Sequence, residues 1–158
     1  MSKKSVGILR YFLKEIEYDC YLIDKGLRRA SYEYIENNPT YINEVKNLVV
    51  KSYDFFIEPD IISNENNNGN YYFYIYKDLS TKLFINIING TQDEVIREYL
   101  MGILLGYSDD SIHYHFNQCC ARIVSKFEKD FPGLDVNTVK DTYLNSLTYV
   151  VYNATEKG

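Results

Sequence analysis

The chain has 158 residues, of which 46% are hydrophobic, and its formal net charge at neutral pH is −5. This length and apolar content predict a single domain over residues 1–158 with a packed core that needs no disulfide framework. The acidic balance, without a long block of basic residues, argues against a protein that binds mainly the phosphate backbone of nucleic acid.

The cysteine content and the N-terminal segment indicate a cytoplasmic protein. Three cysteines, two of them adjacent, do not form a disulfide framework and are typical of a reducing compartment. The apolar run near the N-terminus is interrupted by Arg10, Lys14 and Glu15, which is unlike a signal peptide. We therefore expect no association with a membrane.

Helices are predicted for most of the first third of the chain. Apolar residues recur at three- and four-residue steps from Ser5 to about Lys25, and Gly26 is placed to end that helix. A shorter helix is predicted over Leu27 to Glu36. A third begins at Thr40 and ends near Phe56, before Pro59.

The middle of the chain predicts a small antiparallel sheet over about residues 55–88. Residues 59–70 form a flexible loop rich in asparagine, and "YYFYIY" from Tyr71 to Tyr76 is the clearest strand. The segments "FFIEPDII" before it and "LFINII" after it are its expected partners. The second of these also fits a helical stripe, and we favour a strand because Ile, Phe and Asn are mediocre helix formers.

The C-terminal half predicts helices, which makes the fold α+β and mostly helical, with the sheet between N-terminal and C-terminal helices. "TQDE" from Thr91 to Glu94 resembles a capping box at the start of a helix that ends near Gly106. Ser108 is expected to cap the next helix, which continues to about Phe131. Asn137 is expected to cap a last helix.

Both histidines lie close to two cysteines, which raises the hypothesis of a metal or small-ligand site around His113, His115 and Cys119. On a helix, His113 and His115 point to nearly opposite sides, whereas His115 and Cys119 share a face. A zinc site needs three or four ligands, and the chain offers no second cluster. We therefore expect no metal, no cofactor and no catalytic residue, with His115 and Cys119 as the alternative.

The spacing of Gly102, Gly106 and Ile112 resembles that of helix-turn-helix regulators, with the motif covering residues 102–118. In that alignment the groove-facing helix presents Asp109 and Asp110 to the phosphates. Phosphate contacts supply much of the affinity of such proteins, so this chemistry argues against direct DNA binding. A transcription regulator remains the alternative function.

A second resemblance concerns "LGY", from Leu105 to Tyr107, followed by a capped helix and preceded by a tyrosine-rich strand. The chain is similar in these features to small proteins of unknown function from phages and mobile elements of low-GC Gram-positive bacteria. That resemblance implies a non-enzymatic inhibitor of the anti-defence or anti-CRISPR type, acting in the cytoplasm of a bacterial host cell. Its partner would be a host protein or ribonucleoprotein complex, and the oligomeric state stays open, a homodimer included.

The strand at residues 71–76 provides the predicted partner-binding residues. Side chains alternate along a strand, so Tyr72, Tyr74 and Tyr76 share one face. The other face carries Phe73 and is expected to point into the core, leaving the three tyrosines exposed beside Asp60 and Glu65. The alternative is that these rings pack against another strand or a helix. Tyrosine rings beside carboxylates would suit an arginine-rich partner.

Overall fold

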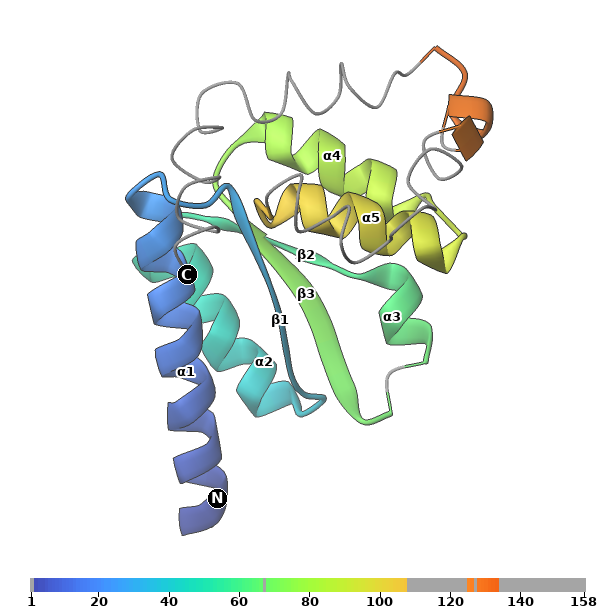
Figure 1. The fold of residues 1–158 in the computed structure, drawn as a ribbon. Coiled ribbons are helices and arrows are strands. Elements are labelled where there is room, and N and C mark those ends of the chain that lie inside the picture. Colours follow the sequence, from blue (N-terminus) through green and yellow to red (C-terminus); the bar gives the residue numbers. More distant parts are fainter. Residues whose placement is uncertain (1, 67, 108–124, 127, 134–158) are drawn as a thin grey trace. The chain divides into compact units, whose positions relative to one another are not determined.

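The computed structural model describes residues 2–66, 68–107, 125–126 and 128–133 (Figure 1). Its elements in chain order are α1 (Lys3–Asp24), β1 (Ala30–Glu36), α2 (Pro39–Lys46), the π-helical turn η1 (Asn47–Ser52), β2 (Phe56–Pro59), α3 (Ile61–Glu65), β3 (Asn70–Tyr76), α4 (Leu79–Asn89) and α5 (Glu94–Leu104). The fold is α+β, mostly helical with one small antiparallel sheet, as the sequence predicts.

The sheet has three strands in the order β1-β3-β2, so β3 is central and antiparallel to both neighbours. The predicted strand over Tyr71 to Tyr76 and its partner before Pro59 are confirmed. The predicted partner at residues 83–88 is wrong, because that segment belongs to helix α4. Asp78 caps this helix by accepting a hydrogen bond from the Thr81 backbone N–H at 2.9 Å, and the buried Phe84, Ile85 and Ile88 follow helical spacing.

The third strand is β1, in a segment that the sequence predicts as helical, so the helix expected over Leu27 to Glu36 is wrong. Side chains of β1 alternate between the two faces of the sheet, with Ser31 and Ile35 fully buried on one face and Tyr34 exposed on the other. Alternation with a period of two is the pattern of a strand. The alternating segment is only seven residues long, and a helical pattern fits its apolar positions nearly as well.

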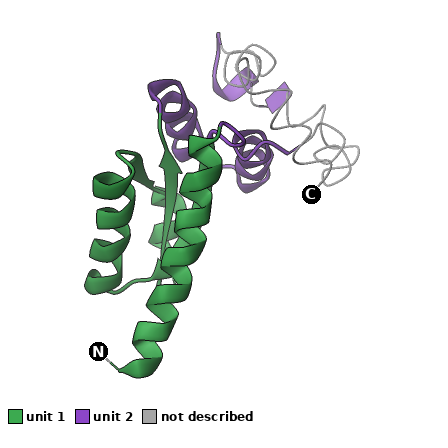
Figure 2. Ribbon diagram, turned by 90° about the vertical axis from the view of Figure 1, so that its left-hand side faces the viewer, with its two compact units in different colours: residues 1–25, 30–77 green, residues 26–29, 78–158 purple. Residues whose placement is uncertain are grey.

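Residues 1–25 and 30–77 form one compact unit (green in Figure 2), in which helices cover one face of the sheet. The predicted first helix is confirmed as α1, and Gly26 follows it with φ of 73°. The predicted third helix corresponds to α2 and η1. The core between these helices and the sheet contains Leu9, Ile16, Cys20, Ile23, Ile35, Tyr41, Val45, Val49, Phe55, Phe73 and Ile75.

The second unit contains residues 26–29 and 78–158, of which helices α4 and α5 are described (Figure 2). α5 is capped by Asp93, whose side chain accepts from the Ile96 N–H at 3.1 Å, so the predicted capping box at Thr91 is wrong. The Thr91 hydroxyl instead donates to the Ile87 carbonyl at 2.7 Å, at the end of α4. Among the described helices, none has the length and apolar content needed to cross a bilayer.

Candidate partner-binding surface

The register of the sheet places tyrosines of two strands on the face opposite the core residues Phe73 and Ile75. The Tyr34 ring, on the edge strand β1, also contacts the Phe12 ring of α1, with centroids 6.4 Å apart. Tyr32 of β1 lies across from Tyr74 of β3, and Tyr34 lies across from Tyr72. Ring centroids are 5.1 Å apart for Tyr32 and Tyr74, 5.6 Å for Tyr34 and Tyr72, and 6.2 Å for Tyr32 and Tyr72. Aromatic pairs at these distances stabilise a sheet across its strands.

The exposure of these rings decreases toward the end of β3. Tyr34 is 49% exposed, and Tyr32 and Tyr72 are half-buried. Tyr74 is 0% exposed and Tyr76 is 1% exposed, so the prediction that both present an outward surface is wrong. The alternation of β3 is as predicted, with Phe73 and Ile75 in the core, but alternation alone cannot tell that the second face is also largely buried.

Asp60, predicted as a partner-facing carboxylate, is 1% exposed and belongs to a buried hydrogen-bond network. One of its oxygens accepts from the Ser63 N–H at 3.1 Å, which caps α3. The other accepts from the Tyr32 hydroxyl and from the Ser63 hydroxyl, each at 2.8 Å. The expectation that Asp60 is exposed is therefore wrong, and its carboxylate joins α3 to β1. Glu65, the second predicted carboxylate, is exposed at the end of α3.

A second contact attaches α3 to the central strand. The Asn64 side chain accepts from the Tyr72 N–H at 2.7 Å and donates to the Tyr72 carbonyl at 2.9 Å. The amide thereby makes the pair of bonds that a neighbouring strand would make, beyond the point where β2 ends at Pro59. Residues 61–65, expected to belong to the loop over 59–70, instead form this helix. The flexibility of the segment stays a prediction.

Glu58 lies on the same face, between the rings of β3 and the α3 end of the sheet. It pairs in register with Tyr74, and one of its carboxylate oxygens accepts from the Tyr76 hydroxyl at 3.3 Å. Burial, followed by the charge and the hydrogen bond of Glu58, raises the pKa of Tyr76 to about 12. The Tyr76 hydroxyl therefore stays protonated across the physiological pH range.

We define the tyrosine surface as Tyr32, Tyr34 and Tyr72. The half-buried Glu58 lies on the same face of the sheet, and the exposed Glu65 ends α3, which packs against β3. Of the residues predicted for partner binding, the surface retains Tyr72, with Glu65 exposed on the adjoining helix. It gains Tyr32 and Tyr34, which sequence analysis missed because their segment was taken for a helix. The signal that would have found them is the alternation of "ASYEYIE", which places both tyrosines on one face of a strand.

The glycine at position 106 ends helix α5. Gly106 has φ of 79°, and the helix before it ends with the Tyr107 N–H bonded to the Gly102 carbonyl and the Gly106 N–H bonded to the Ile103 carbonyl. This Schellman motif confirms the predicted end of the helix at Gly106. Leu104 is buried there, as predicted, whereas Leu105 is only half-buried.

Ser108, Ile112, His113, His115 and Cys119 lie outside the described residues, so the predicted cap, the helix-turn-helix and the alternative metal site stay predictions. Within the described residues, no group of three His, Cys, Asp or Glu side chains is arranged to hold a metal ion. Cys20 is buried in the core of the first unit. Burial, together with the charges of Asp19 and Glu17, raises its pKa to about 12, which keeps the thiol unreactive.

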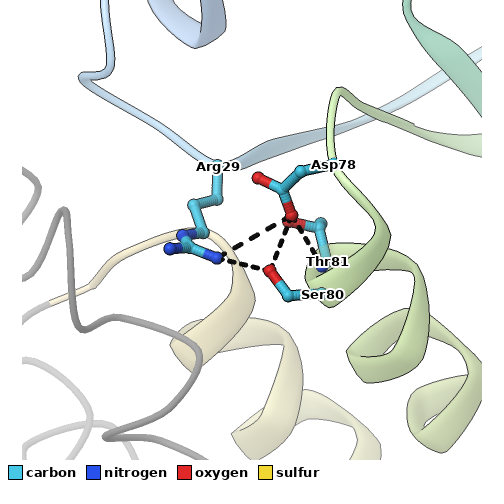
Figure 3. Close-up of polar contacts among 4 residues, drawn as sticks. All are labelled: Arg29, Asp78, Ser80 and Thr81. Carbon is cyan, nitrogen blue, oxygen red and sulfur yellow. Dashed lines mark hydrogen bonds and ion pairs between the residues drawn. The ribbon is translucent and has the colours of Figure 1, made fainter.

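A polar cluster of the second unit lies at the start of α4 (Figure 3). One Asp78 oxygen accepts from the hydroxyls of Ser80 and Thr81, both at 2.7 Å, and an Arg29 nitrogen lies 3.8 Å from it. Arg29 also donates to the Ser80 hydroxyl at 2.7 Å. Burial alone would raise the pKa of Asp78, but these hydrogen bonds and the arginine lower it. The cluster attaches residues 26–29 to α4 and is structural.

Comparisons of the chain with protein-family models, with curated proteins and with solved structures found no match.

Proposed function

We propose that the chain is a non-enzymatic protein-binding protein whose partner contacts the tyrosine surface. Tyrosine combines a large apolar ring with a hydroxyl and is enriched in protein interfaces. The carboxylates of Glu58 and Glu65 give the surface a negative border. A partner that presents arginine fits this combination, because a guanidinium stacks on ring faces and pairs with carboxylates.

The observation that carries this proposal is the fixed position of partly exposed rings on strands. Tyr34 remains 49% exposed although its ring contacts Tyr72, and Tyr72 is bonded through its backbone to Asn64. A surface that is already ordered loses little conformational entropy on binding, which favours affinity. Scattered exposed tyrosines on loops would not provide this advantage.

For the partner itself, we propose a host defence complex of the CRISPR type or another nucleic-acid-binding complex. The support is the resemblance of the chain to small proteins of phages and mobile elements. Surfaces that bind nucleic acid are rich in arginine, the chemistry that suits the tyrosine surface. Inhibition would follow from occupying such a surface and excluding the nucleic acid.

A transcription regulator with a helix-turn-helix over residues 102–118 is the second candidate. The observation in its favour is the corner at Gly106, whose positive φ and Schellman hydrogen bonds suit a tight turn between helices. A gel shift with random duplex DNA at low salt tests it. Retention of the duplex favours the regulator, and free duplex at micromolar protein contradicts it.

The test of protein binding uses a short peptide with three arginines and the same peptide with lysines, titrated into isotope-labelled protein. We expect the arginine peptide to shift the amide signals of Tyr32, Tyr34 and Tyr72 and to bind more tightly than the lysine peptide. Tyr34→Arg should remove these shifts by charge repulsion, whereas Tyr107→Arg, at a tyrosine 52% exposed in the other unit, should not. Shifts that avoid the tyrosine surface, or that do not distinguish arginine from lysine, contradict the proposal.

The proposed target is tested in bacteria in which a CRISPR-type complex removes an incoming plasmid. The chain should protect the plasmid, the Tyr34→Arg variant should not, and Tyr107→Arg should protect it as well as the unaltered chain. Plasmid loss that is equal with and without the chain contradicts this target.

A further inference from the structure

The side of α1 that faces away from the core carries basic and tyrosine side chains. The buried residues Leu9, Ile16, Cys20 and Ile23 mark the core-facing side of this 22-residue helix. The opposite side, within about a third of the circumference at 3.6 residues per turn, presents six exposed residues that we term the basic stripe. These are Arg10, Tyr11, Lys14, Tyr18, Tyr21 and Lys25.

Two cations of the basic stripe, Arg10 and Lys14, do not serve the stability of the helix, whereas Lys25 is its C-cap, where the helix dipole favours a cation. Arg10 and Lys14 are four residues apart, so like charges face each other, which destabilises a helix. Within the described part of the chain, neither side chain forms an ion pair. Lys3 and Lys4 add positive charge to the first turn, where the helix dipole favours acidic residues. Local choices that oppose stability without compensation are typical of functional surfaces.

The tyrosines of the stripe are unusually open for aromatic residues of a helix that packs on a sheet. Tyr11 is 63% exposed and Tyr18 is 60% exposed. The Tyr18 and Tyr21 rings are stacked at 6.5 Å with an interplanar angle of 18°, and the Lys25 ammonium lies 5.7 Å from the Tyr21 centroid. The helix therefore presents exposed rings and cations together on one side.

We propose that the basic stripe binds single-stranded nucleic acid. Lysine and arginine neutralise backbone phosphates, and exposed aromatic rings stack on unpaired bases of any sequence. Duplex bases are already stacked on each other, so open tyrosine rings favour a single strand. The stripe extends from Arg10 to Lys25, about 23 Å along the helix axis at a rise of 1.5 Å per residue. This inference goes beyond protein binding and does not depend on it, because it uses none of the residues of the tyrosine surface. The α1 residue whose ring contacts Tyr34 is Phe12, which is not part of the stripe.

Two other occupants fit the stripe less well. A helix that lies on a membrane inserts its apolar side, and the apolar side of α1 is in the core against the sheet. A second copy of the chain would have to provide clustered exposed carboxylates. On the border of the tyrosine surface, Glu58 is half-buried and Glu65 is a single exposed carboxylate, which is less than a stripe of three cations needs.

The test is fluorescence anisotropy with labelled single strands of about 15 nucleotides, within the range of known single-strand site sizes, made of dU and of U, which differ only in the sugar. We expect both to bind in low salt, and the preference for one sugar identifies DNA or RNA as the natural ligand. The double variant Arg10→Gln and Lys14→Gln should lower affinity at least tenfold. It should also reduce the slope of log affinity against log salt by about 1.4, because two phosphate contacts are lost.

A matched double variant, Lys46→Gln and Lys51→Gln, removes the same charge from exposed lysines of α2 and η1 and should change affinity less than twofold. Tyr18→Leu should lower affinity roughly tenfold without changing the salt slope, because it removes a stacking platform and no charge. Circular dichroism of each variant confirms that the helix is intact.

Several outcomes would overturn the proposal. These are no binding at about 10 μM protein in low salt, equal losses in the two double variants, or tighter binding to duplex than to single strand. Sedimentation with phosphatidylserine vesicles that depends on Arg10 and Lys14, without oligonucleotide binding, would assign the stripe to a membrane. Dissociation on dilution that the same double variant abolishes, again without oligonucleotide binding, would assign it to a second copy of the chain.

Discussion

Replacing Asp60 by alanine removes the carboxylate that joins α3 to β1. That carboxylate caps α3 through the Ser63 N–H and accepts from the hydroxyls of Tyr32 and Ser63. A helix cap contributes about 1 kcal/mol. Hydrogen bonds to a charged group contribute about 1.5–3 kcal/mol each when their donors stay dry, but Tyr32 and Ser63 are half-buried and regain water.

We therefore expect Asp60→Ala to lower the free energy of unfolding by about 3 kcal/mol, with each hydroxyl contributing about 1 kcal/mol after that regain. Urea denaturation followed by circular dichroism measures this as a lower midpoint with an unchanged slope. Asp24→Ala is the matched control, because its carboxylate is exposed and forms only a 3.9 Å ion pair with Lys77. Its expected cost is below about 0.5 kcal/mol.

A double-mutant cycle with Tyr32→Phe isolates the bond between the two side chains. We expect the two changes to couple by more than about 0.5 kcal/mol, as is typical of residues in one hydrogen-bond network. Additive effects, or a cost of Asp60→Ala no larger than that of Asp24→Ala, would refute the role given to this network. The position of α3 beside β1 would then need another explanation.

Three further predictions concern stability. Gly106→Val should lower the free energy of unfolding by more than about 1 kcal/mol, because φ is 79° at this position. Gly7→Ala, at a position of α1 with no atom near the added Cβ, should raise it by about 0.5–1 kcal/mol, and thermal denaturation compares the two variants. Ser31→Ala should leave the stability unchanged or raise it slightly, since the buried Ser31 hydroxyl has no hydrogen-bond partner among the described residues. A free energy of unfolding lowered by more than about 1 kcal/mol in urea denaturation would contradict this. The pKa values of Cys20 and Tyr76 are raised from 9.0 and 10.0 to about 12 in the folded chain. The unfolded chain therefore loses these protons at lower pH than the folded chain. The free energy of unfolding should be constant below about pH 9 and should fall as the pH rises toward 12, by about 1.4 kcal/mol per pH unit for each group. A free energy of unfolding that does not change over that pH range would contradict the burial of both groups.

The elements with long, regular patterns could be predicted from the sequence. α1 repeats its apolar residues over 22 residues, and β3 combines aromatic and β-branched residues with clear alternation. Short segments are ambiguous, because a few apolar positions fit both periods. For this reason the sequence pattern predicts a helix where β1 forms and a strand where α4 forms. The structure of both segments depends on contacts outside them: β1 pairs along the whole length of β3, and the Asp78 side chain caps the residues that follow it as a helix.

The candidate surfaces were less predictable than the elements. Burial of Tyr74 and Asp60 depends on what packs against each face, which local alternation does not specify. The basic stripe was missed for a different reason. Its cations are separated along the chain, and the net charge of the chain is −5, so the composition does not reveal a basic surface. Arg10, Lys14 and Lys25 lie on one side only when the segment is a helix.

The central claim is that an ordered tyrosine surface on β1 and β3 binds an arginine-bearing partner. Hydroxyl-radical footprinting with and without the arginine peptide tests it most directly, because it measures the accessibility of each tyrosine ring. We predict that Tyr34 and Tyr72 are labelled in the free chain and protected by the peptide, that Tyr18 is labelled in both states, and that Tyr74 stays unlabelled. Unchanged labelling of Tyr34 in the presence of bound peptide, or labelling of Tyr74 as fast as that of Tyr34, would contradict the claim.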